Sequence, residues 1–197
     1  MIRNVTIVGA GALGSHLALF ARNWPQELEV HLRVVDDDRV EAKNLAAQAH
    51  SKMGLGKNKV VALKQLLQGL YGLNLDIAAH RVTENSIVAM LSDSTLVVDC
   101  TDNAATRRLL QTHCAGHHLP LLHGALSADA TLGLVDWSPS FTVDEEGAPG
   151  QPTCENGLAL PFHALVAAQL ALTAQRFLSA GEQRSYQITP TGILRVG

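Results

Sequence analysis

Apolar and polar residues alternate in a regular succession of patterns along the first third of the chain. Residues 5–8 form a short β-branched run typical of a buried strand, and residues 15–22 follow with helical spacing. Residues 28–36 alternate and predict a second strand, and residues 57–72 have helical spacing that ends at a glycine stop. The chain therefore begins with strands alternating with helices, which is typical of a parallel sheet.

The same alternation continues toward the carboxyl terminus, and its last part changes character. Residues 138–157 are rich in proline, glycine and acids and predict a crossover loop. The next segment, 158–178, is a strongly apolar helix whose broad apolar surface must pack in the core or against another subunit. The remaining predicted elements are strands at 74–80, 95–100, 119–123 and 132–137, helices at 86–91 and from 103 to 114, and a hairpin of 186–189 with 193–196.

Three glycines, Gly9, Gly11 and Gly14, join the first predicted strand to the first predicted helix. In this strand-to-helix context the spacing G-x-G-x-x-G is a nucleotide-binding fingerprint: the first glycine permits a tight turn, the second lets phosphate approach the backbone, and the third lets the helix lie close to the sheet. The helix amino terminus adds free N–H groups and a positive dipole end. We therefore expect nucleotide at this loop.

Together these patterns predict an α/β fold that is Rossmann-like, with a mostly parallel sheet, helices on both faces and a mixed C-terminal part. We expect residues 1–137 to form the nucleotide-binding core and 138–157 to form a mobile crossover loop. Residues 158–197 should supply a helix and hairpin that complete the same domain.

Composition narrows the classes of partner. The chain has 197 residues, 47% of them hydrophobic and 17% charged, with a net charge of −3, so it lacks the broad basic field that nucleic acid would require. The run from 158 to 172 is too short and too often interrupted for a membrane span, and Met1 leads directly into the first strand without room for a signal core. Three cysteines without a C-x-x-C pair argue against a disulfide framework or structural zinc. We expect a cytoplasmic protein that binds neither nucleic acid nor membrane.

Polar residues follow the second and fourth predicted strands. Asp36 lies 22 residues beyond Gly14, the distance at which folds of this kind place a carboxylate on ribose hydroxyls. Residues 99–103 read Asp-Cys-Thr-Asp-Asn and end a strand that is apolar enough to be buried on both faces. The connection 39–56 has little periodicity, and loops of this length in compact domains are usually functional or mobile. We expect a ligand along this edge of the sheet.

Three motifs in this order resemble the ThiF/MoeB family of adenylating enzymes, which includes the nucleotide-binding domain of ubiquitin-activating enzymes. The resemblance covers roughly residues 3 to 137, and its second and third motifs are far more specific than the glycine fingerprint. The motifs are Gly9-x-Gly11-x-x-Gly14; Asp36-x-Asp38-x-Val40-x-x-x-Asn44-Leu45-x-x-Gln48 with Gly56-Lys57-Asn58-Lys59; and Asp99-Cys100-Thr101-Asp102-Asn103 with Arg107 and Pro120-Leu121-Leu122-His123-Gly124-Ala125.

The resemblance implies an activity, its cofactors and its partners. Members adenylate the C-terminal glycine of a small ubiquitin-like or sulfur-carrier protein with ATP and Mg²⁺, and a homodimer or hetero-complex is expected. By position, the cofactor-binding residues are Gly9, Gly11, Gly14, Asp36, Asp38, Asn44, Lys59, Asp102 and Asn103, with the glycines facing the phosphates, Asp36 the ribose, and Asn44 and Lys59 the phosphate side. Asp102 would hold the magnesium ion and Asn103 would lie beside the nucleotide, and the resemblance makes Lys59 and Asp102 catalytic.

The sequence also departs from the family pattern. Ala47 stands where the family's Asn-Leu-x-Arg-Gln motif has an arginine that contacts ATP phosphates. Many members receive a second arginine from a helix that precedes the first strand in the neighbouring subunit, whereas this sequence starts at that strand. Lys43, Lys52 or Lys57 are candidate substitutes, although a lysine lacks the bidentate geometry of a guanidinium. The family's paired C-x-x-C zinc ligands are absent as well.

The cysteines and histidines offer further candidate chemistry. Cys154 lies where some relatives keep a cysteine that accepts the activated acyl group, so it is a candidate thioester nucleophile, with an incidental thiol as the alternative. Cys100 ends a buried strand and is expected to be a small core residue. His113, Cys114, His117 and His118 favour a solvated helix end over a metal site, because no second ligand pair matches them.

Three hypotheses for function remain. The first is an ATP-dependent adenylyltransferase that acts on the C-terminal carboxylate of a small protein. The second is a pseudoenzyme of the same fold that holds nucleotide or a ubiquitin-like tail without turnover, as Ala47 would permit. The third, a nicotinamide-dependent oxidoreductase, shares the glycine motif and Asp36 but does not explain Asn44, Lys59 and Asp102 together.

Overall fold

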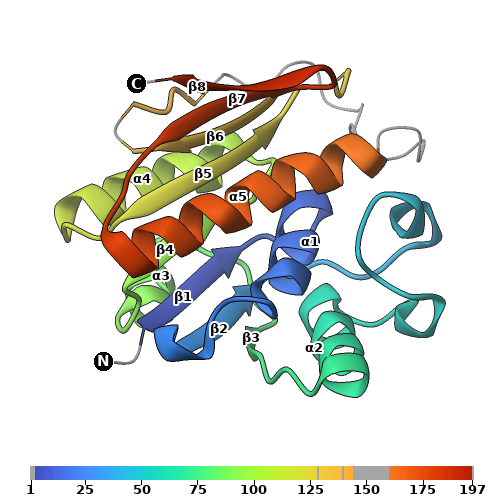
Figure 1. Cartoon of the computed structure of the whole chain (residues 1–197). Coiled ribbons are helices and arrows are strands. Elements are labelled where there is room, and N and C mark those ends of the chain that lie inside the picture. The colour runs from blue at the N-terminus through green and yellow to red at the C-terminus, as the bar shows by residue number, and fades with distance from the viewer. Residues whose placement is uncertain (1–2, 128, 139, 144–159, 197) are drawn as a thin grey trace.

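The structure, a computed structural model, describes residues 3–127, 129–138, 140–143 and 160–196. Strands and helices alternate along most of the chain (Figure 1). The strands are β1 (Arg3–Val8), β2 (Val30–Val35), β3 (Asp76–Ala78), β4 (Leu96–Asp99), β5 (Leu121–Leu126), β6 (Gly133–Trp137), β7 (Ser185–Thr189) and β8 (Gly192–Val196). The helices are α1 (Ala12–Ala21), α2 (Lys59–Tyr71), α3 (Ile87–Leu91), α4 (Ala104–Gly116) and α5 (Leu160–Ala180), with short 3₁₀ turns at Gln26–Leu28, Ala42–Ala46 and Lys52–Gly54.

The eight strands of the described residues belong to one sheet in the order β3-β2-β1-β4-β5-β6-β7-β8. The first five strands in this order pair in parallel, and β6, β7 and β8 continue the sheet with antiparallel pairing. This confirms the predicted fold class, including the mixed C-terminal part. The register places Val8 opposite both Val35 and Asp99, so the loops after β1, β2 and β4 leave the sheet at the same edge.

Helices cover both faces of the sheet, as expected from the buried character of β4. The larger core cluster joins β1 to residues of α1, α2 and α5, and the smaller cluster joins β4 to α3 and α4. In Figure 1, α5 runs across the front of the sheet beside α1, and α4 lies behind it. The four residues of β4 are fully buried because both faces are covered.

Element boundaries differ from the sequence expectation by a few residues. Helix α1 begins at Ala12, three residues before the expected start, so Gly14 lies inside its first turn. The strand expected over 28–36 is shorter, because Leu28 ends a 3₁₀ turn and β2 begins at Val30. The glycine stop of α2 is confirmed: Gly72 caps this helix in the left-handed region with φ of 68°.

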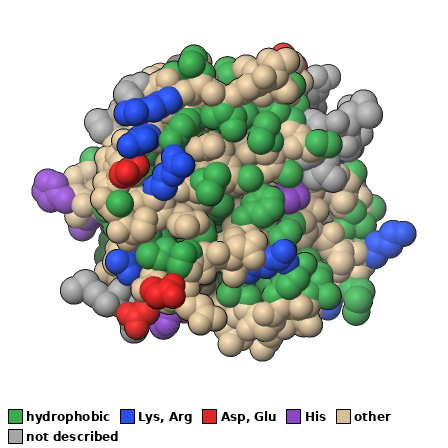
Figure 2. All heavy atoms as spheres, in the orientation of Figure 1, with side chains coloured by type: hydrophobic (Ala, Val, Ile, Leu, Met, Phe, Trp, Pro, Cys, Tyr) green, Lys and Arg blue, Asp and Glu red, His purple; other side chains and the backbone are tan. Residues whose placement is uncertain are grey.

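Helix α5 and the β7–β8 hairpin occupy the places predicted for the C-terminal segment. One side of α5 is buried against the rest of the core, and its other side exposes Leu165 and Leu172. Figure 2 shows hydrophobic side chains among uncharged surface in the middle of this face of the molecule. Within the part of the chain that the structure describes, no helix is long and apolar enough to cross a membrane.

Candidate functional site

Backbone atoms of the chain itself pack closely against two glycines of the loop after β1. Gly9 has φ of +97°, and a Cβ there would lie 2.8 Å from the Cys100 carbonyl oxygen, while a Cβ at Gly14 would lie 1.8 Å from the Gly9 carbonyl oxygen. Both positions therefore require glycine for the fold itself. A Cβ at Gly11 would meet only the Gln48 side chain, at 4.0 Å. The neighbouring atoms of the chain therefore do not demand glycine at position 11, and its contact with phosphate stays a prediction.

Two side chains hold the peptide groups of Ala10 in the middle of this loop. The Ala10 N–H donates to Asp36 Oδ2 over 2.6 Å, and the Ala10 carbonyl oxygen accepts from His50 Nε2 over 2.9 Å. Burial raises the pKa of Asp36 despite the attraction of Lys59 and the backbone N–H donors. Burial likewise lowers the pKa of His50. Asp36 therefore holds the glycine loop in place. It does so from the end of β2, where the sequence predicts a carboxylate that binds ribose.

Lys59, the first residue of α2, lies among carboxylates at the end of β2. Its buried Nζ donates to Asp38 Oδ2 over 2.8 Å, and its N–H donates to the Asp38 carbonyl oxygen over the same distance. Burial works to lower the pKa of Lys59, but attraction to Asp36, the hydrogen bond with Asp38 and attraction to Asp102 raise it overall. Three of the predicted site residues therefore act on the positive charge of a fourth, Lys59.

Asp102 and Asn103 follow β4 at the same edge of the sheet. Asn103 caps α4, because its Oδ1 accepts from the Thr106 N–H over 2.8 Å, and the Asp102 carboxylate is exposed. One carboxylate oxygen from each residue of the neighbouring acidic run, Asp36 to Asp38, lies within 4.8 Å of the other two. Exposed carboxylate oxygens are the donors that Mg²⁺ prefers, together with water and phosphate, so the residues at this edge fit magnesium.

Asn44, predicted on the phosphate side, has a local role as well. Its Oδ1 accepts from the Glu41 N–H over 3.0 Å, and the Glu41 side chain accepts from the Asn44 N–H, so the pair forms a capping box on a 3₁₀ turn. A contact with phosphate from this side chain would have to come from the amide nitrogen. Ala47, in the next turn, is fully buried, so the methyl group that replaces the family's arginine is enclosed by protein.

A buried carboxylate lies directly beneath the Asp102 loop. Asp99 has no exposed surface, and its Oδ1 accepts from both the N–H and the hydroxyl of Thr101, over 2.9 and 2.7 Å. Arg107 Nε lies 3.7 Å from Asp99 Oδ2, and the Arg107 guanidinium also donates to the Thr101 and Gly124 carbonyl oxygens. Burying a charge is costly unless it is paired and hydrogen-bonded, and both conditions hold here. Thr101 is therefore held by hydrogen bonds at its N–H, its hydroxyl and its carbonyl oxygen.

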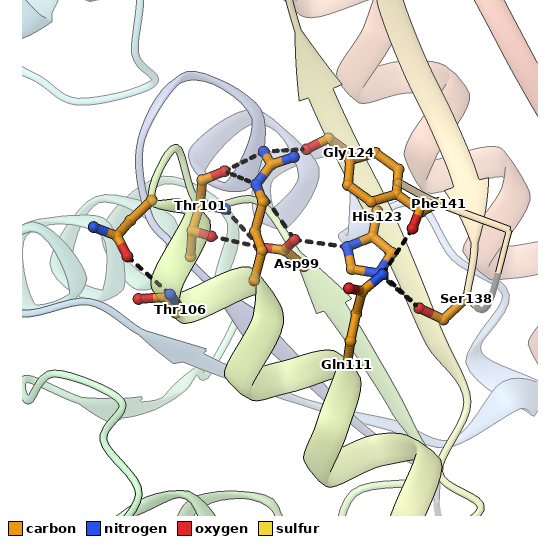
Figure 3. Close-up of polar contacts among 10 residues, drawn as sticks. Asp99, Thr101, Thr106, Gln111, His123, Gly124, Ser138 and Phe141 are labelled. Atoms are coloured by element: carbon orange, nitrogen blue, oxygen red, sulfur yellow. Dashed lines mark hydrogen bonds and ion pairs between the residues drawn. The ribbon is translucent and has the colours of Figure 1, made fainter. Parts of the chain in front are cut away.

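His123 of β5 completes this network (Figure 3). Its Nδ1 donates to Asp99 Oδ2 over 2.7 Å, and its Nε2 lies 2.8 Å from the hydroxyl oxygen of Ser138, just after β6. The imidazole is fully buried and stacks on Phe141 with 4.3 Å between ring centroids. Gln111 of α4 donates to the Phe141 carbonyl oxygen over 2.8 Å, which ties the same turn to the helix.

Sequence reasoning placed His123 and Arg107 within a motif but assigned no contact to either, and it did not single out Ser138 or His50 for the site. The available signal was a histidine between apolar residues of a buried strand, since such a ring needs polar partners. The proposed nucleophile Cys154 lies outside the described residues. Cys100 packs partly buried against the larger core cluster, and burial raises its pKa.

The sequence resembles characterised adenylating enzymes. The profile of the ThiF family matches residues 3–191. The adenylyltransferase and sulfurtransferase MOCS3 of Anopheles gambiae is 34% identical over 138 residues, which are 68% of this chain and 30% of that protein. The SAMP-activating enzyme E1 of Haloferax volcanii is 35% identical over 128 residues, 62% of this chain and 45% of that protein. The chain thus spans less than half the length of these two relatives.

The fold has solved counterparts. The crystal structure of E. coli MccB with ATP superposes with a TM-score of 0.77 at 16% identity, covering 99% of this chain and 63% of that one. A second MccB structure, with succinimide, gives a TM-score of 0.79 with the same identity and coverage. At this identity the similarity concerns the fold, including the C-terminal strands that follow α5.

Proposed function

Because the chain belongs to the ThiF family, we propose that it is an ATP-dependent adenylyltransferase that activates the C-terminal carboxylate of a small ubiquitin-like or sulfur-carrier protein. The observation that carries this proposal is the buried Lys59, whose ammonium group donates to Asp38 while Asp36, which holds the glycine loop, and Asp102 raise its pKa by electrostatic attraction. This arrangement supplies acceptors for ribose or metal and a fixed cation at one edge of the sheet.

The reaction needs charge neutralisation more than acid–base catalysis. A carboxylate oxygen of the carrier attacks the α-phosphorus of ATP, the bond from that phosphorus to the bridging oxygen breaks, and pyrophosphate leaves. The attacking carboxylate is already ionised at neutral pH, so no general base is required. Lys59 and the N–H groups at the start of α1 neutralise phosphate charge, which stabilises the transition state electrostatically.

Asp102 is the residue that we propose as the magnesium ligand. When bound, magnesium neutralises the phosphate oxygens and orients the leaving pyrophosphate. The positive charge of Lys59 attracts the Asp102 carboxylate, and it would also attract the phosphates of the nucleotide. We assign the ribose to Asp36, whose Oδ2 accepts from the Ala10 N–H of the glycine loop and whose Oδ1 accepts from the Asp38 N–H.

The relatives support the same class of substrate. One relative is named an adenylyltransferase and sulfurtransferase and the other a SAMP-activating enzyme, and the solved MccB structures include complexes with ATP and with MccA-N7isoASN. We extend this to a carrier protein whose flexible C-terminal tail enters the nucleotide edge. ThiF membership also favours adenylylation over the hydride transfer of an oxidoreductase.

A second candidate function is nucleotide or tail binding without turnover. The buried Ala47 favours it, because the family's arginine is replaced by a methyl group enclosed in the fold. In phosphoryl-transfer enzymes an arginine at the phosphates is worth about 10³–10⁵ in rate. Either a partner supplies that charge or this chain turns over slowly.

We also propose that Cys154 accepts the acyl group as a thioester. Its thiolate would attack the carbonyl carbon of the adenylate and AMP would leave, so that atoms and charge balance. Cys154→Ser should abolish a conjugate sensitive to reducing agents and spare adenylate formation. A reducing-agent-sensitive conjugate that survives Cys154→Ser would assign the acyl group to another residue.

Exchange of radiolabelled pyrophosphate into ATP, in the presence of purified carrier proteins with C-terminal glycine, tests the proposal. Carrier-dependent exchange that is lost in Asp102→Ala supports the enzyme. Tight ATP binding without exchange for any carrier supports the binding function, and preference for NADH over ATP contradicts both.

A further inference from the structure

We propose that His123 is a positioning residue that fixes the loop carrying Asp102 and thereby sets the magnesium requirement of ATP binding. His123 itself lies in β5, fully buried, and acts through other side chains. This inference rests on the proposed function only in taking Asp102 as the magnesium ligand.

The path from His123 to Asp102 is short and made of direct contacts. His123 Nδ1 holds Asp99 Oδ2 at 2.7 Å, and Asp99 Oδ1 holds the N–H and hydroxyl of Thr101, the residue before Asp102. Without the imidazole, Oδ2 would keep only Arg107 Nε at 3.7 Å, which is beyond hydrogen-bonding distance. A buried carboxylate that loses a donor turns toward another partner, and this movement releases Thr101.

The other side of the imidazole is held as firmly. Its Nε2 lies 2.8 Å from the Ser138 hydroxyl oxygen, so hydrogen bonds at both ring nitrogens fix the ring plane. Phe141 stacks on one face of the ring, and Arg107 lies 5.3 Å from the centre of the same phenyl ring. The turn after β6 therefore braces the histidine from two directions (Figure 3).

The contact order Asp99, His123, Ser138 is that of a serine hydrolase triad, but the burial argues against such a role. A triad histidine takes the serine proton and then gives it to the leaving group, so it must reach the substrate. His123 has no exposed surface and is covered by Phe141. The geometry is therefore that of a support for the loop that carries Asp102, in the way that hydrogen-bonded neighbours orient metal-binding groups.

Two substitutions of His123 test the two hydrogen bonds of its imidazole one at a time. In His123→Asn the amide nitrogen occupies the position of Nδ1 and keeps the bond to Asp99, whereas in His123→Gln the amide group reaches the position of Nε2 and keeps only Ser138. His31→Asn, at an exposed histidine of β2, is the matched control. The measurement is MgATP binding by titration calorimetry at several magnesium concentrations, with the thermal midpoint of each variant recorded.

We expect His123→Gln to raise the half-saturating magnesium concentration about tenfold, and His123→Asn and the control to stay within about twofold of the wild type. Ser138→Ala keeps the bond from His123 to Asp99, so it should also stay within about twofold of the wild type. A role in stability alone would lower the thermal midpoints and leave magnesium dependence unchanged in the folded protein, which would overturn the proposal. Equal effects of His123→Asn and His123→Gln would overturn it as well, as would covalent labelling of Ser138 by a fluorophosphonate.

Separate measurements of MgATP binding and of pyrophosphate exchange distinguish this inference from the proposed function. If wild-type protein binds MgATP but catalyses no exchange, the adenylyltransferase proposal fails while the contrast between the two His123 variants can still be measured. If exchange is robust and both variants share the wild-type magnesium dependence, the enzyme stands and the positioning role fails.

Discussion

Lys59 Nζ lies 2.8 Å from Asp38 Oδ2 and is buried, so one ammonium group is fixed at the centre of an otherwise acidic edge. Three carboxylates attract it and raise its pKa above the usual 10.5. The group is therefore fully charged at physiological pH and oriented before any phosphate arrives.

The first prediction concerns this charge. Lys59→Met should lower kcat/KM for ATP in pyrophosphate exchange by about 10²–10³, the cost of removing one oriented group that stabilises transition-state charge. Lys59→Arg keeps the charge and is the control. Unchanged turnover in Lys59→Met would refute the assigned role.

The raised pKa of Lys59 also fixes the sign of its effect on stability. A group whose pKa is higher in the folded protein stabilises fully below its unfolded pKa, and its contribution is lost as pH rises through the folded value. The destabilisation caused by Lys59→Met should therefore be constant between about pH 6 and pH 9 and decline only above that range. Chemical denaturation across this range measures it.

A second prediction separates folding from phosphate binding within the glycine loop. Gly14→Ala should fold poorly, because the added methyl group would lie 1.8 Å from the Gly9 carbonyl oxygen. Gly11→Ala meets nothing closer than 4.0 Å, so its thermal midpoint should stay near that of the wild type while the KM for ATP rises. Normal ATP affinity in a folded Gly11→Ala protein would argue against phosphate at this position.

A third prediction concerns the metal ligand. Asp102→Asn removes a charge at an exposed position, so the protein should fold normally and lose exchange by about 10²-fold or more, with partial recovery at high magnesium. Asp76→Asn, at another exposed aspartate, is the control. Exchange in Asp102→Asn with the wild-type magnesium dependence would place the metal on other residues.

Much of the fold could be predicted because it depends on local patterns. The β-branched runs and the helical spacing before Gly72 are each complete within a dozen residues, and each produced the expected element. The position of Asp36 beside the glycine loop also follows from topology, since adjacent parallel strands end at one edge. Exact boundaries were less accessible, because capping contacts such as that of Asn103 decide them.

The network under Asp102 could not be predicted because it depends on pairing between distant segments. His123 reaches Ser138 only because β6 turns back antiparallel to β5, with Asp136 opposite His123. Nothing in a single sequence fixes that register. Asn44 illustrates the converse case, since its motif suggested a phosphate contact and its Oδ1 also makes a local cap.

The last prediction concerns a buried histidine outside the network. His163 of α5 has no exposed surface, and among the described residues neither ring nitrogen has a hydrogen-bond partner. Burial and the nearby His16 lower its pKa below 6.5. The lowered pKa of a histidine in the folded protein has no effect on stability at high pH, and it destabilises the protein progressively as pH falls below the unfolded pKa. The wild type should therefore lose stability below about pH 6.5, partly through this residue.

His163→Leu should remove both the cost of the unpaired ring nitrogens and the loss of stability at low pH. Each buried polar atom without a partner costs about 1–3 kcal/mol, so an apolar side chain of similar size should raise the thermal midpoint by several degrees, at about 2–4 °C for each kcal/mol in a chain of this length. The gain in stability should grow as pH falls, because the buried imidazole of the wild type disfavours protonation and leucine has no group to protonate. Thermal unfolding from about pH 5 to pH 8 measures the difference, with His31→Leu as the exposed control. A variant less stable than the wild type at every pH would mean that His163 has a polar partner that offsets its burial.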